Sequence, residues 1–370
     1  RYIQYIIDNT IETETNLIVQ TRSWGDLCDW LGLEDEKNDK SLVWEAYFIY
    51  DLELMAKMAT VLGKVTDAEW FRELHAARKD FFNKTYIEPE TGKTLFSAFV
   101  PEKKGSHIDI QTSYVLPLAF NIIDEENRNK VIANLAETVR RENTTDRGQQ
   151  CPSYSLMTGF IGTSWINKAL SDYGHSDLAY RLLQQTSYPS WLYSIEQGAT
   201  TIWERLNSYT RTDGFGGNNR MNSFNHYSFG AVGAWMYNYS LGIQRDETFP
   251  GFKQFVLKPM PDPTGKMTYA RGYYDSMYGR IESGWKVESG VIRYTFTVPA
   301  NTTATLYLPT ASLRDVREKT KPVRKCKGVE FISEGNGEVV LKLLSGSYSF
   351  EVKKDYPLAA RKRKKYVFVR

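Results

Sequence analysis

Cysteine and histidine are scarce in this chain, and their spacing excludes several kinds of site. Among 370 residues there are 3 Cys and 4 His. The cysteines lie far apart and form no CxxC pair, which excludes a zinc knuckle and a dithiol motif; one disulfide is allowed and none is required. The histidines show no HxH or HxxxH spacing, which argues against a His-rich metal site. We therefore predict no metal and no cofactor.

Long hydrophobic runs and nucleotide-binding loops are also missing. No stretch of about 18 uncharged apolar residues occurs, so we expect no transmembrane span. There is no GxSxG and no GxxxxGK[ST] motif, which excludes a nucleophile elbow and a Walker-type phosphate loop. Residues 213–219 are rich in glycine but follow no predicted strand, so we interpret them as a loop. The chain starts with Arg1 and no signal-like segment, and we interpret it as a piece of a longer product.

Charge of one sign gathers only at the C-terminus. The formal net charge is +3. Residues 353–370 hold eight Lys/Arg against Asp355, so the remainder carries 3 − 7 = −4. We interpret 354–370 as a solvated basic tail, although such a run could also bind nucleic acid or anionic lipid. Because no basic stripe occurs elsewhere, we expect no nucleic-acid partner for the folded part.

Up to about residue 242 the apolar residues recur with the period of a helix. Their spacing in 42–62 predicts a half-buried helix that is stopped by Gly63. Thr66–Glu69 resembles a capping box that opens the next helix, which runs to about Asn83. Further helices are expected at 2–20, 109–121, 125–142, 158–173, 176–186 and 226–240. About eight helices joined by short loops are typical of stacked helical hairpins.

Beyond residue 248 the pattern changes to period two. Four prolines between Pro250 and Pro263 indicate a boundary. Alternating segments then predict a β-sandwich of about 100 residues; they lie at 293–298, 303–308, 339–344 and 348–352. We therefore predict a helical domain at 1–248, a β-sandwich at 249–353 and the tail at 354–370.

Aromatic residues are abundant, with 24 Tyr, 18 Phe and 9 Trp. Three polar segments combine them with carboxylates or histidine: 24–30 (WGDLCDW), 188–205 (with YPSWLY and GATTIWER) and 222–227 (NSFNHY). A glycoside hydrolase needs such groups, because one carboxyl group protonates the leaving oxygen while another activates water or attacks the anomeric carbon. Aromatic walls would hold the sugar ring. The alternative is a helical scaffold with packed tryptophans, since rings also pack well in cores.

Five segments resemble the bacterial α-L-rhamnosidases of glycoside hydrolase family 78. They are YPSWLY at 188–193, GATTIWER at 198–205, NSFNHY at 222–227, LMTGFIGT at 156–163 and PGF at 250–252. The resemblance runs from about residue 1 to 352 and leaves the tail unmatched. It implies a multi-domain fold, α then β. The first part would be a partial (α/α)6 barrel, because about eight helices cannot close twelve, and a β-sandwich would follow.

The resemblance also implies roles for individual residues. Glu204 is expected to be the general base of an inverting reaction. The sugar site is expected to be lined by His226, Trp203, Trp191 and Arg205. The position after Arg205, where the family usually has tryptophan, is leucine in this chain.

The family's glycine–aspartate–tryptophan motif fits this chain in two ways. Asp29 and Trp30 match its end, whereas Asp26 follows a glycine but precedes no tryptophan. We assign the hydroxyl-binding role to Asp29 and the stacking role to Trp30, with Asp26 as the alternative. A second interpretation makes Asp29 a loop or N-cap residue.

These features together predict an exo-acting α-L-rhamnosidase that removes terminal α-L-rhamnose from glycosides or polysaccharides with inversion. Its general acid is expected upstream, since the chain holds no stretch that matches the family's acid-bearing segment. Two alternatives stay open: another (α/α)6 carbohydrate hydrolase or phosphorylase, and a non-catalytic carbohydrate-binding relative. A secreted or periplasmic location is expected from the habit of polysaccharide-degrading enzymes.

Overall fold

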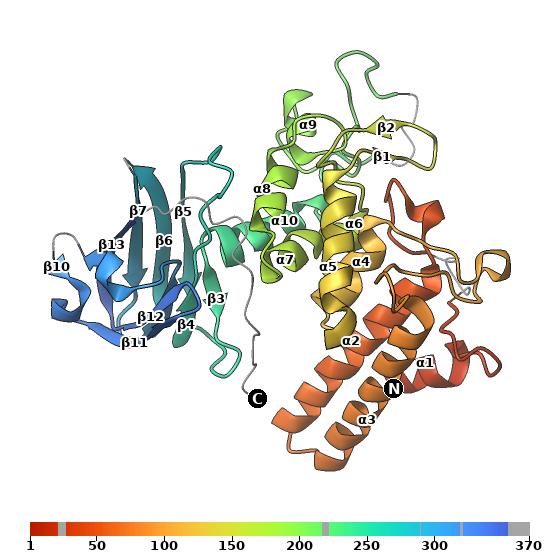
Figure 1. The fold of residues 1–370 in the computed structure, drawn as a ribbon, viewed down its shortest axis with the longest axis horizontal. Helices are drawn as coiled ribbons and strands as arrows, with labels where there is room; N and C mark the ends of the chain where they lie inside the picture. The colour runs from red at the N-terminus through yellow and green to blue at the C-terminus, as the bar shows by residue number, and fades with distance from the viewer. Residues whose placement is uncertain (21–26, 217–221, 289, 319–320, 354–370) are drawn as a thin grey trace. The chain divides into compact units, whose positions relative to one another are not determined.

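We obtained a computed structural model of the protein, which describes residues 1–20, 27–216, 222–288, 290–318 and 321–353. The chain divides into two compact units, Arg1–Val232 and Gly233–Arg370. The first unit is mainly helical and the second is rich in strands (Figure 1). The predicted fold class, a helical region followed by a sheet-rich region, is therefore confirmed.

The helical unit contains two long helices and several shorter ones. The long pair, α2 (Lys40–Val61) and α3 (Val65–Tyr86), lies side by side (Figure 1). The other α-helices that lie wholly within this unit are α1 (Tyr2–Thr10), α4 (Gln111–Ala119), α5 (Glu125–Arg140), α6 (Phe160–Thr163), α7 (Ile166–Asp172), α8 (Ser176–Gln184) and α9 (Trp191–Glu196). Short 3-10 turns are η1 (Asp35–Lys37), η2 (Pro101–Lys103) and η3 (Ser228–Ala231), and a small hairpin is formed by β1 (Asn143–Thr144) and β2 (Gln150–Cys151).

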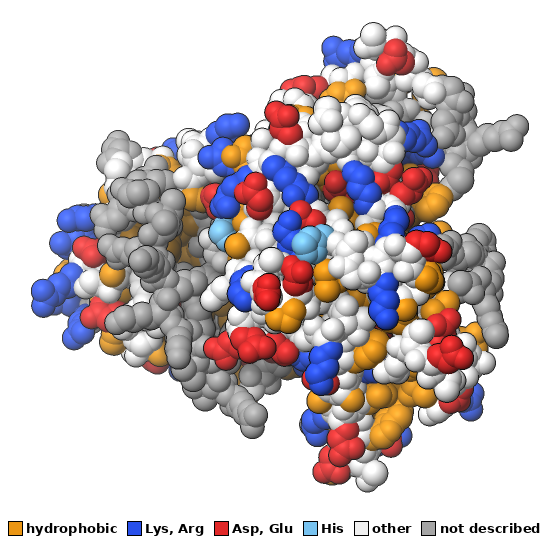
Figure 2. Space-filling view, turned by 45° about the vertical axis from the view of Figure 1, so that its right-hand side comes forward, with side chains coloured by type: hydrophobic (Ala, Val, Ile, Leu, Met, Phe, Trp, Pro, Cys, Tyr) orange, Lys and Arg blue, Asp and Glu red, His pale blue; other side chains and the backbone are white. Residues whose placement is uncertain are grey.

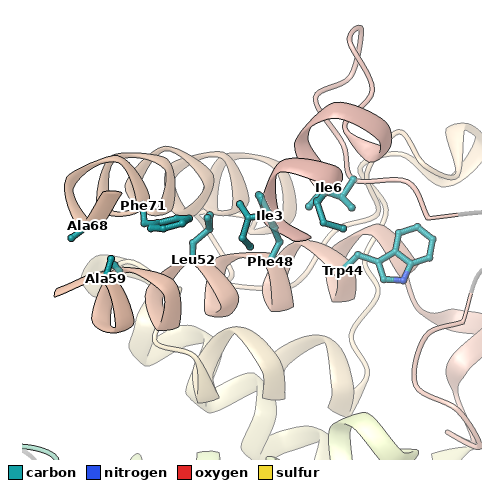
Figure 3. Packing of buried hydrophobic residues seen from close by; sticks show 10 residues of the cluster. Ile3, Ile6, Trp44, Phe48, Leu52, Ala59, Ala68 and Phe71 are labelled. Carbon is teal, nitrogen blue, oxygen red and sulfur yellow. The ribbon is translucent and has the colours of Figure 1, made fainter. Parts of the chain in front are cut away.

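Apolar side chains of α1, α2 and α3 pack into a common cluster. Figure 3 labels its main members: Ile3, Ile6, Trp44, Phe48, Leu52, Ala59, Ala68 and Phe71. At the start of α2 the Asp39 carboxylate accepts a hydrogen bond from Ser41 N at 2.9 Å, and after its end Gly63 has a φ of 69°. A capping acceptor and a glycine that tolerates positive φ thus explain where the helix predicted at 42–62 begins and ends.

The helix predicted at 2–20 is too long. The chain is helical only to Thr10, and it then reverses so that Ile11 pairs with Ile18. The reversal requires a positive φ of 58° at Asn16, a conformation that asparagine tolerates better than most residues. The apolar spacing of this segment therefore reflects a helix and a returning strand-like segment.

Other helix predictions need smaller corrections. The helix expected at 158–173 is divided into α6 and α7, because the backbone leaves helical geometry at Trp165 (φ −123°). The segment expected at 226–240 is a succession of η3, α10 (Val232–Trp235) and a π-helical turn, η4 (Met236–Ser240). The capping box at Thr66 is wrong, since α3 follows Lys64 and has no side-chain cap.

The second unit consists of two sheets, with strand orders β10-β9-β13-β7-β6-β5 and β11-β12-β8-β4-β3. The strands predicted from alternation are confirmed as β7 (Val291–Val298), β8 (Thr303–Leu308), β12 (Glu338–Leu343) and β13 (Gly346–Lys353). The remaining strands are β3 (Ile243–Arg245), β4 (Gln254–Leu257), β5 (Tyr269–Ser276), β6 (Gly279–Glu288), β9 (Val316–Glu318), β10 (Lys321–Pro322) and β11 (Val329–Gly335), with 3-10 turns η5 (Leu313–Asp315) and η6 (Val323–Lys325). The largest fully buried side chains of this unit are Trp285, Tyr294, Phe255 and Phe350.

The two units divide at 232/233, and β3 lies between that division and the boundary predicted at 248/249. It pairs with β4 from Ile243↔Leu257 to Arg245↔Phe255, so residues before 248 already belong to a sheet. Sequence analysis missed β5 and β6. The edge strand β5 is exposed or half-buried along its whole length, so it lacks the apolar alternation that marks a half-buried strand.

The surface and the ends of the chain add little to the placement of a site. Among the described residues no helix is both long and apolar enough to cross a membrane. On the face shown in Figure 2, acidic and basic side chains are interspersed. The predicted basic tail at 354–370 lies outside the described residues.

Candidate active site

Glu204 lies on a backbone segment that pairs with the segment carrying His226. Glu204 N donates to Ser223 O at 2.8 Å, and His226 N donates to Ile202 O at 2.8 Å. The Thr201 hydroxyl also donates to the carbonyl of Phe224. Two segments about twenty residues apart are therefore held together without forming a regular sheet. The pairing brings Glu204 and His226 into one small region.

The Glu204 carboxylate is buried, and only one of its two oxygens accepts a hydrogen bond from the described residues. The residue is 8% exposed, and its Oε2 accepts a hydrogen bond from Ser223 N at 2.8 Å. Its Oε1 accepts no hydrogen bond from the described residues, and no ion pair with Arg205 is formed among them. A carboxylate with one oxygen fixed and the other unengaged can accept a proton from a water molecule.

The His226 ring is positioned by neighbouring aromatic rings and by the backbone amide of Ser228. Its ring lies 4.7 Å from that of Phe160 and is stacked on Tyr227 at 5.6 Å. Ser228 N donates to Nδ1 at 3.4 Å, which favours the neutral tautomer with its proton on Nε2. Nε2 can then donate to a hydroxyl group of a ligand.

Asp29 is fully buried, and protein donors surround its carboxylate. Oδ2 accepts hydrogen bonds from Gly159 N at 2.8 Å and from the Thr112 hydroxyl. Oδ1 accepts from Ile161 N and Gly162 N, both at 2.9 Å. Burial raises the pKa of Asp29 to about 6, although these hydrogen bonds oppose the shift. This arrangement matches the loop-or-capping interpretation, and the hydroxyl-binding role stays a prediction.

The loop after Asp29 packs tightly against the segment that leads into α6. Phe160 N donates to Trp30 O at 3.0 Å, and Leu33 N donates to Met157 O at 3.0 Å. A Cβ on Gly159 would lie 2.3 Å from the carbonyl oxygens of both Asp29 and Trp30. Only glycine fits at such a distance. Phe160 therefore links the loop that carries Trp30 to the ring of His226.

The three predicted tryptophans differ in exposure. Trp30 is 38% exposed, whereas Trp191 and Trp203 are each 7% exposed. Trp191 Nε1 donates to Phe229 O at 2.8 Å, and the Trp203 ring packs edge-on against Phe224 at 5.3 Å. Burial favours a packing role for Trp191 and Trp203, and leaves Trp30 as the ring best placed to stack on a sugar.

The remaining predicted residues are Arg205 and Asp26. Arg205 Nε is buried and has no hydrogen-bond partner among the described residues, while Arg205 N donates to Ser208 Oγ at 3.1 Å. Burial raises the pKa of Tyr188 to about 12, and the charges of Arg147 and Arg205 oppose this shift. Asp26 lies outside the described residues.

A small hollow in this unit lies beside Asp29 and away from Glu204. It is lined by Asp29, Gly32, Glu34, Asp35, Asn38, Ile110, Gln111, Thr112 and Met157. Because Asp29 turns its oxygens toward backbone donors and neither Glu204 nor His226 reaches the hollow, we do not place the chemistry there. In the described part of the chain no group of three His, Cys, Asp or Glu side chains could hold a metal ion.

Comparison with known families identifies the helical unit. The model of the bacterial alpha-L-rhamnosidase 6 hairpin glycosidase domain matches residues 1–240. The chain belongs to this family. The bacterial alpha-L-rhamnosidase C-terminal domain follows at residues 242–322. The resemblance stated from the sequence is therefore confirmed, and it covers both units.

Relatives of this rhamnosidase-family chain are longer proteins. An alpha-L-rhamnosidase of Formosa agariphila is 32% identical over 331 residues, which cover 88% of this chain and 33% of the relative. The crystal structure of Streptomyces avermitilis alpha-L-rhamnosidase complexed with L-rhamnose is 32% identical, with a TM-score of 0.77, over 95% of this chain and 30% of that one. The alpha-L-rhamnosidase from Dictyoglumus thermophilum is 30% identical, with a TM-score of 0.72, over 90% and 34%. This chain therefore spans about a third of the length of the relatives it matches.

Sequence analysis missed two residues, Phe160 and Ser223, that connect the segments of the candidate active site. Phe160 joins the Trp30 loop to His226, and the Ser223 amide fixes the Glu204 carboxylate. Phe160 lies within the segment 156–163, which was one of the five that resemble the family. The sequence therefore marked this segment, but it did not show what Phe160 contacts. The Ser223 contact is made by a backbone amide, and no side-chain pattern reveals such a contact.

Proposed function

We propose that the protein is an exo-acting α-L-rhamnosidase that works with inversion and uses Glu204 as its general base. The observation that carries the proposal is the state of the Glu204 carboxylate: it is 8% exposed, Oε2 is held by Ser223 N, and Oε1 is left without a donor among the described residues. The family of the chain and the names of its relatives support the choice of rhamnoside as substrate.

In this mechanism Glu204 Oε1 accepts a proton from a water molecule while the water attacks the anomeric carbon of rhamnose. The bond to the leaving oxygen breaks on the opposite face of the sugar. An inverting enzyme also needs a carboxylic acid about 6.5–9.5 Å from the base, which protonates that oxygen. We assign no residue of this chain to that step.

We propose that the substrate is held by groups on the segments that carry Glu204, His226 and Trp30. We propose that His226 Nε2 donates to a sugar hydroxyl, that the exposed face of Trp30 stacks on the C–H face of the ring, and that the Arg205 guanidinium supplies a further donor. The roles of His226 and Trp30 make use of groups that protein partners leave available, a ring nitrogen and a ring face. The role of Arg205 makes use of a guanidinium whose buried Nε has no hydrogen-bond partner among the described residues.

The test is hydrolysis of p-nitrophenyl α-L-rhamnoside by the intact gene product and by its Glu204→Gln variant. Glutamine keeps the shape of the side chain and removes its basicity, so we expect kcat to fall by about 10²–10⁴-fold with little change in folding. Glu196→Gln, at an exposed position on α9, is the matched control and should retain full activity. Proton NMR of the first product should show β-L-rhamnose.

Three results would contradict the proposal. Turnover by Glu204→Gln within a few-fold of the wild-type rate would make Glu204 structural. Initial release of α-L-rhamnose would exclude inversion. A strict requirement for inorganic phosphate would favour a phosphorylase over a hydrolase.

A further inference from the structure

The outer face of the six-stranded sheet carries exposed tyrosines that the proposed reaction does not use. On β5, Tyr269 is 66% exposed and Tyr273 is 49% exposed. Because side chains alternate across a strand, Tyr269, Arg271 and Tyr273 project from one face. Their partners on β6 include Lys286 and Glu282, whereas the intervening Trp285 points to the other face and is buried. The tyrosines therefore lie on the solvent side of the sheet.

The positions between the two rings carry short or flexible side chains. Four residues of extended chain place Tyr269 and Tyr273 about 13 Å apart along β5. Between them Arg271 pairs with Gly284 on β6, and Gly284 pairs with the exposed Thr295 on β7. Gly284 raises no side chain, so a ligand that spans the two rings meets only short or flexible groups.

The ring of Tyr273 is covered on one face by an arginine. The Arg280 guanidinium lies over it, with Cζ 3.8 Å from the ring centroid. Arg280 is in turn bound by Asp275, through Nε at 2.8 Å and Nη2 at 3.1 Å. Arg280 therefore forms an ion pair with Asp275, and its guanidinium covers one face of the Tyr273 ring.

Arg271 differs from the other cations of this face because its charge is unmatched. It is exposed, and its guanidinium makes no hydrogen bond or ion pair with a described residue. By contrast, Lys286 pairs with Glu288 at 2.6 Å, and Arg293 pairs with Glu351 at 2.8 Å. A guanidinium has the fork geometry that binds a carboxylate through two parallel hydrogen bonds.

We propose that this face is a glycan-binding site for an acidic oligosaccharide. Tyr269 and Tyr273 stack on sugar rings, and Arg271 binds the carboxylate of a uronic acid that lies between them. The separated rings with polar groups between them suit a sugar chain better than a protein, whose interface would have a contiguous apolar centre. The choice of a sugar ligand rests on the proposed function, while the acidic character comes from Arg271.

The test is isothermal titration of the intact protein with hexagalacturonate and with its fully methyl-esterified form. We expect the acid to bind more tightly than the ester. Arg271→Gln should weaken binding of the acid by about ten-fold and leave binding of the ester unchanged, because only the charge-assisted bonds are lost. Tyr269→Ala and Tyr273→Ala should weaken binding of both forms.

The matched control is Arg314→Gln, at an exposed arginine elsewhere in the same unit. Every variant keeps the basic residues 354–370, so their contribution to polyanion binding is common to all. The inference is overturned if the ester binds as tightly as the acid, or if Arg314→Gln weakens binding as much as Arg271→Gln. If Arg271→Gln weakened binding of dextran sulfate as much as binding of hexagalacturonate, the assignment of a uronic acid would be overturned.

Hydrolysis separates this inference from the proposed function. The Arg271 and tyrosine variants should hydrolyse p-nitrophenyl α-L-rhamnoside at the wild-type rate, because none of these residues belongs to the proposed active site. A wild-type protein that hydrolyses the rhamnoside but binds neither hexagalacturonate nor its ester would refute the inference alone. Intact, Arg271-dependent binding by a protein that hydrolyses no rhamnoside would refute the proposed function alone.

Discussion

Buried carboxylates are fixed differently in the two units of the molecule. In the sandwich, Asp262 accepts hydrogen bonds from Thr264 N at 2.7 Å and Met267 N at 2.8 Å, two and five residues away. In the helical unit, Asp29 accepts from Gly159, 130 residues away, and Glu45 from Arg78, 33 residues away. The sandwich uses its buried charge to shape one turn, whereas the helical unit uses it to join distant segments.

The difference teaches where each unit can carry function. Strands are joined by backbone hydrogen bonds, so the sandwich needs few buried polar side chains. The glycan-binding residues that we propose for it lie on its outer face. Helices satisfy their own backbone groups, and the loops between them need side chains to hold them in place. Asp29 and Glu204 both do this, since each carboxylate accepts a hydrogen bond from a backbone amide of another segment. If this comparison holds, removing buried charge should damage the helical unit far more than removing surface charge damages the sandwich.

The largest effect is expected from the Glu45–Arg78 pair, whose side chains are 0% and 5% exposed. Arg78 Nε donates to Glu45 Oε1 at 2.8 Å, and its Nη1 donates to Asn16 Oδ1 at 2.9 Å. Arg78→Met leaves Glu45 buried and unpaired, so the free energy of unfolding should fall by about 3–5 kcal/mol. Hydrogen exchange of α2 and α3, followed by mass spectrometry in increasing urea, measures this locally.

The double variant Glu45→Leu/Arg78→Met should recover most of that loss, because no unpaired charge remains buried. Asp275→Asn removes one partner of an exposed pair in the sandwich, and it should leave the unfolding midpoint unchanged. If Arg78→Met and Asp275→Asn had equal effects, the contrast between the two units would be wrong.

A smaller effect is expected at Asp29. Asp29→Ala leaves the amides of Gly159, Ile161 and Gly162 without their acceptor, so the free energy of unfolding should fall by about 2–4 kcal/mol. Asp29→Asn keeps one acceptor oxygen and should lose less. Thermal denaturation gives the stabilities, and the KM for p-nitrophenyl α-L-rhamnoside gives a second readout. A raised KM at unchanged stability would instead make Asp29 a sugar ligand.

Much of the fold follows from local patterns in the sequence. The structure places the helix predicted at 42–62 and the strands predicted at 293–298 and 303–308 within a few residues. The two strands bury alternate residues as predicted, whereas the helix buries all of residues 41–46 and leaves Met58 and Leu62 exposed. The errors occur where a local pattern competes with tertiary contacts. Residues 2–20 keep apolar spacing through a chain reversal, and β5 lies at a sheet edge where no burial imposes alternation.

The candidate site was less visible than the fold. Glu204 and His226 could be singled out by the resemblance, but the contacts that bring them together are backbone hydrogen bonds. Trp191 and Trp203 sit in the same segment as Glu204, yet burial separates them from the more exposed Trp30. Sequence spacing shows which residues are near one another along the chain and says little about which of them solvent can reach.

The smallest effect that sharpens the comparison is a pH dependence carried by Glu34. This side chain is 6% exposed, and burial raises its pKa from 4.5 to about 7. Lys37, at 3.6 Å, and Arg141 oppose the shift, while Asp146 adds to it. Between pH 4.5 and 7 the folded protein therefore keeps a proton that the unfolded chain releases. The free energy of unfolding should then fall as the pH rises through this interval.

We expect that fall to be on the order of 1–3 kcal/mol, and to be absent in Glu34→Gln, which has no proton to release. At pH 7.5 the glutamine variant should therefore be more stable relative to wild type than it is at pH 5. Urea denaturation at both pH values, again followed through the amides of the helical unit, measures the difference. Glu90→Gln, at an exposed position, is the matched control and should follow the wild-type curve. Parallel curves for wild type and Glu34→Gln would show that Glu34 stays ionised in the folded protein, because the Lys37 and Arg141 charges would then outweigh the cost of its burial.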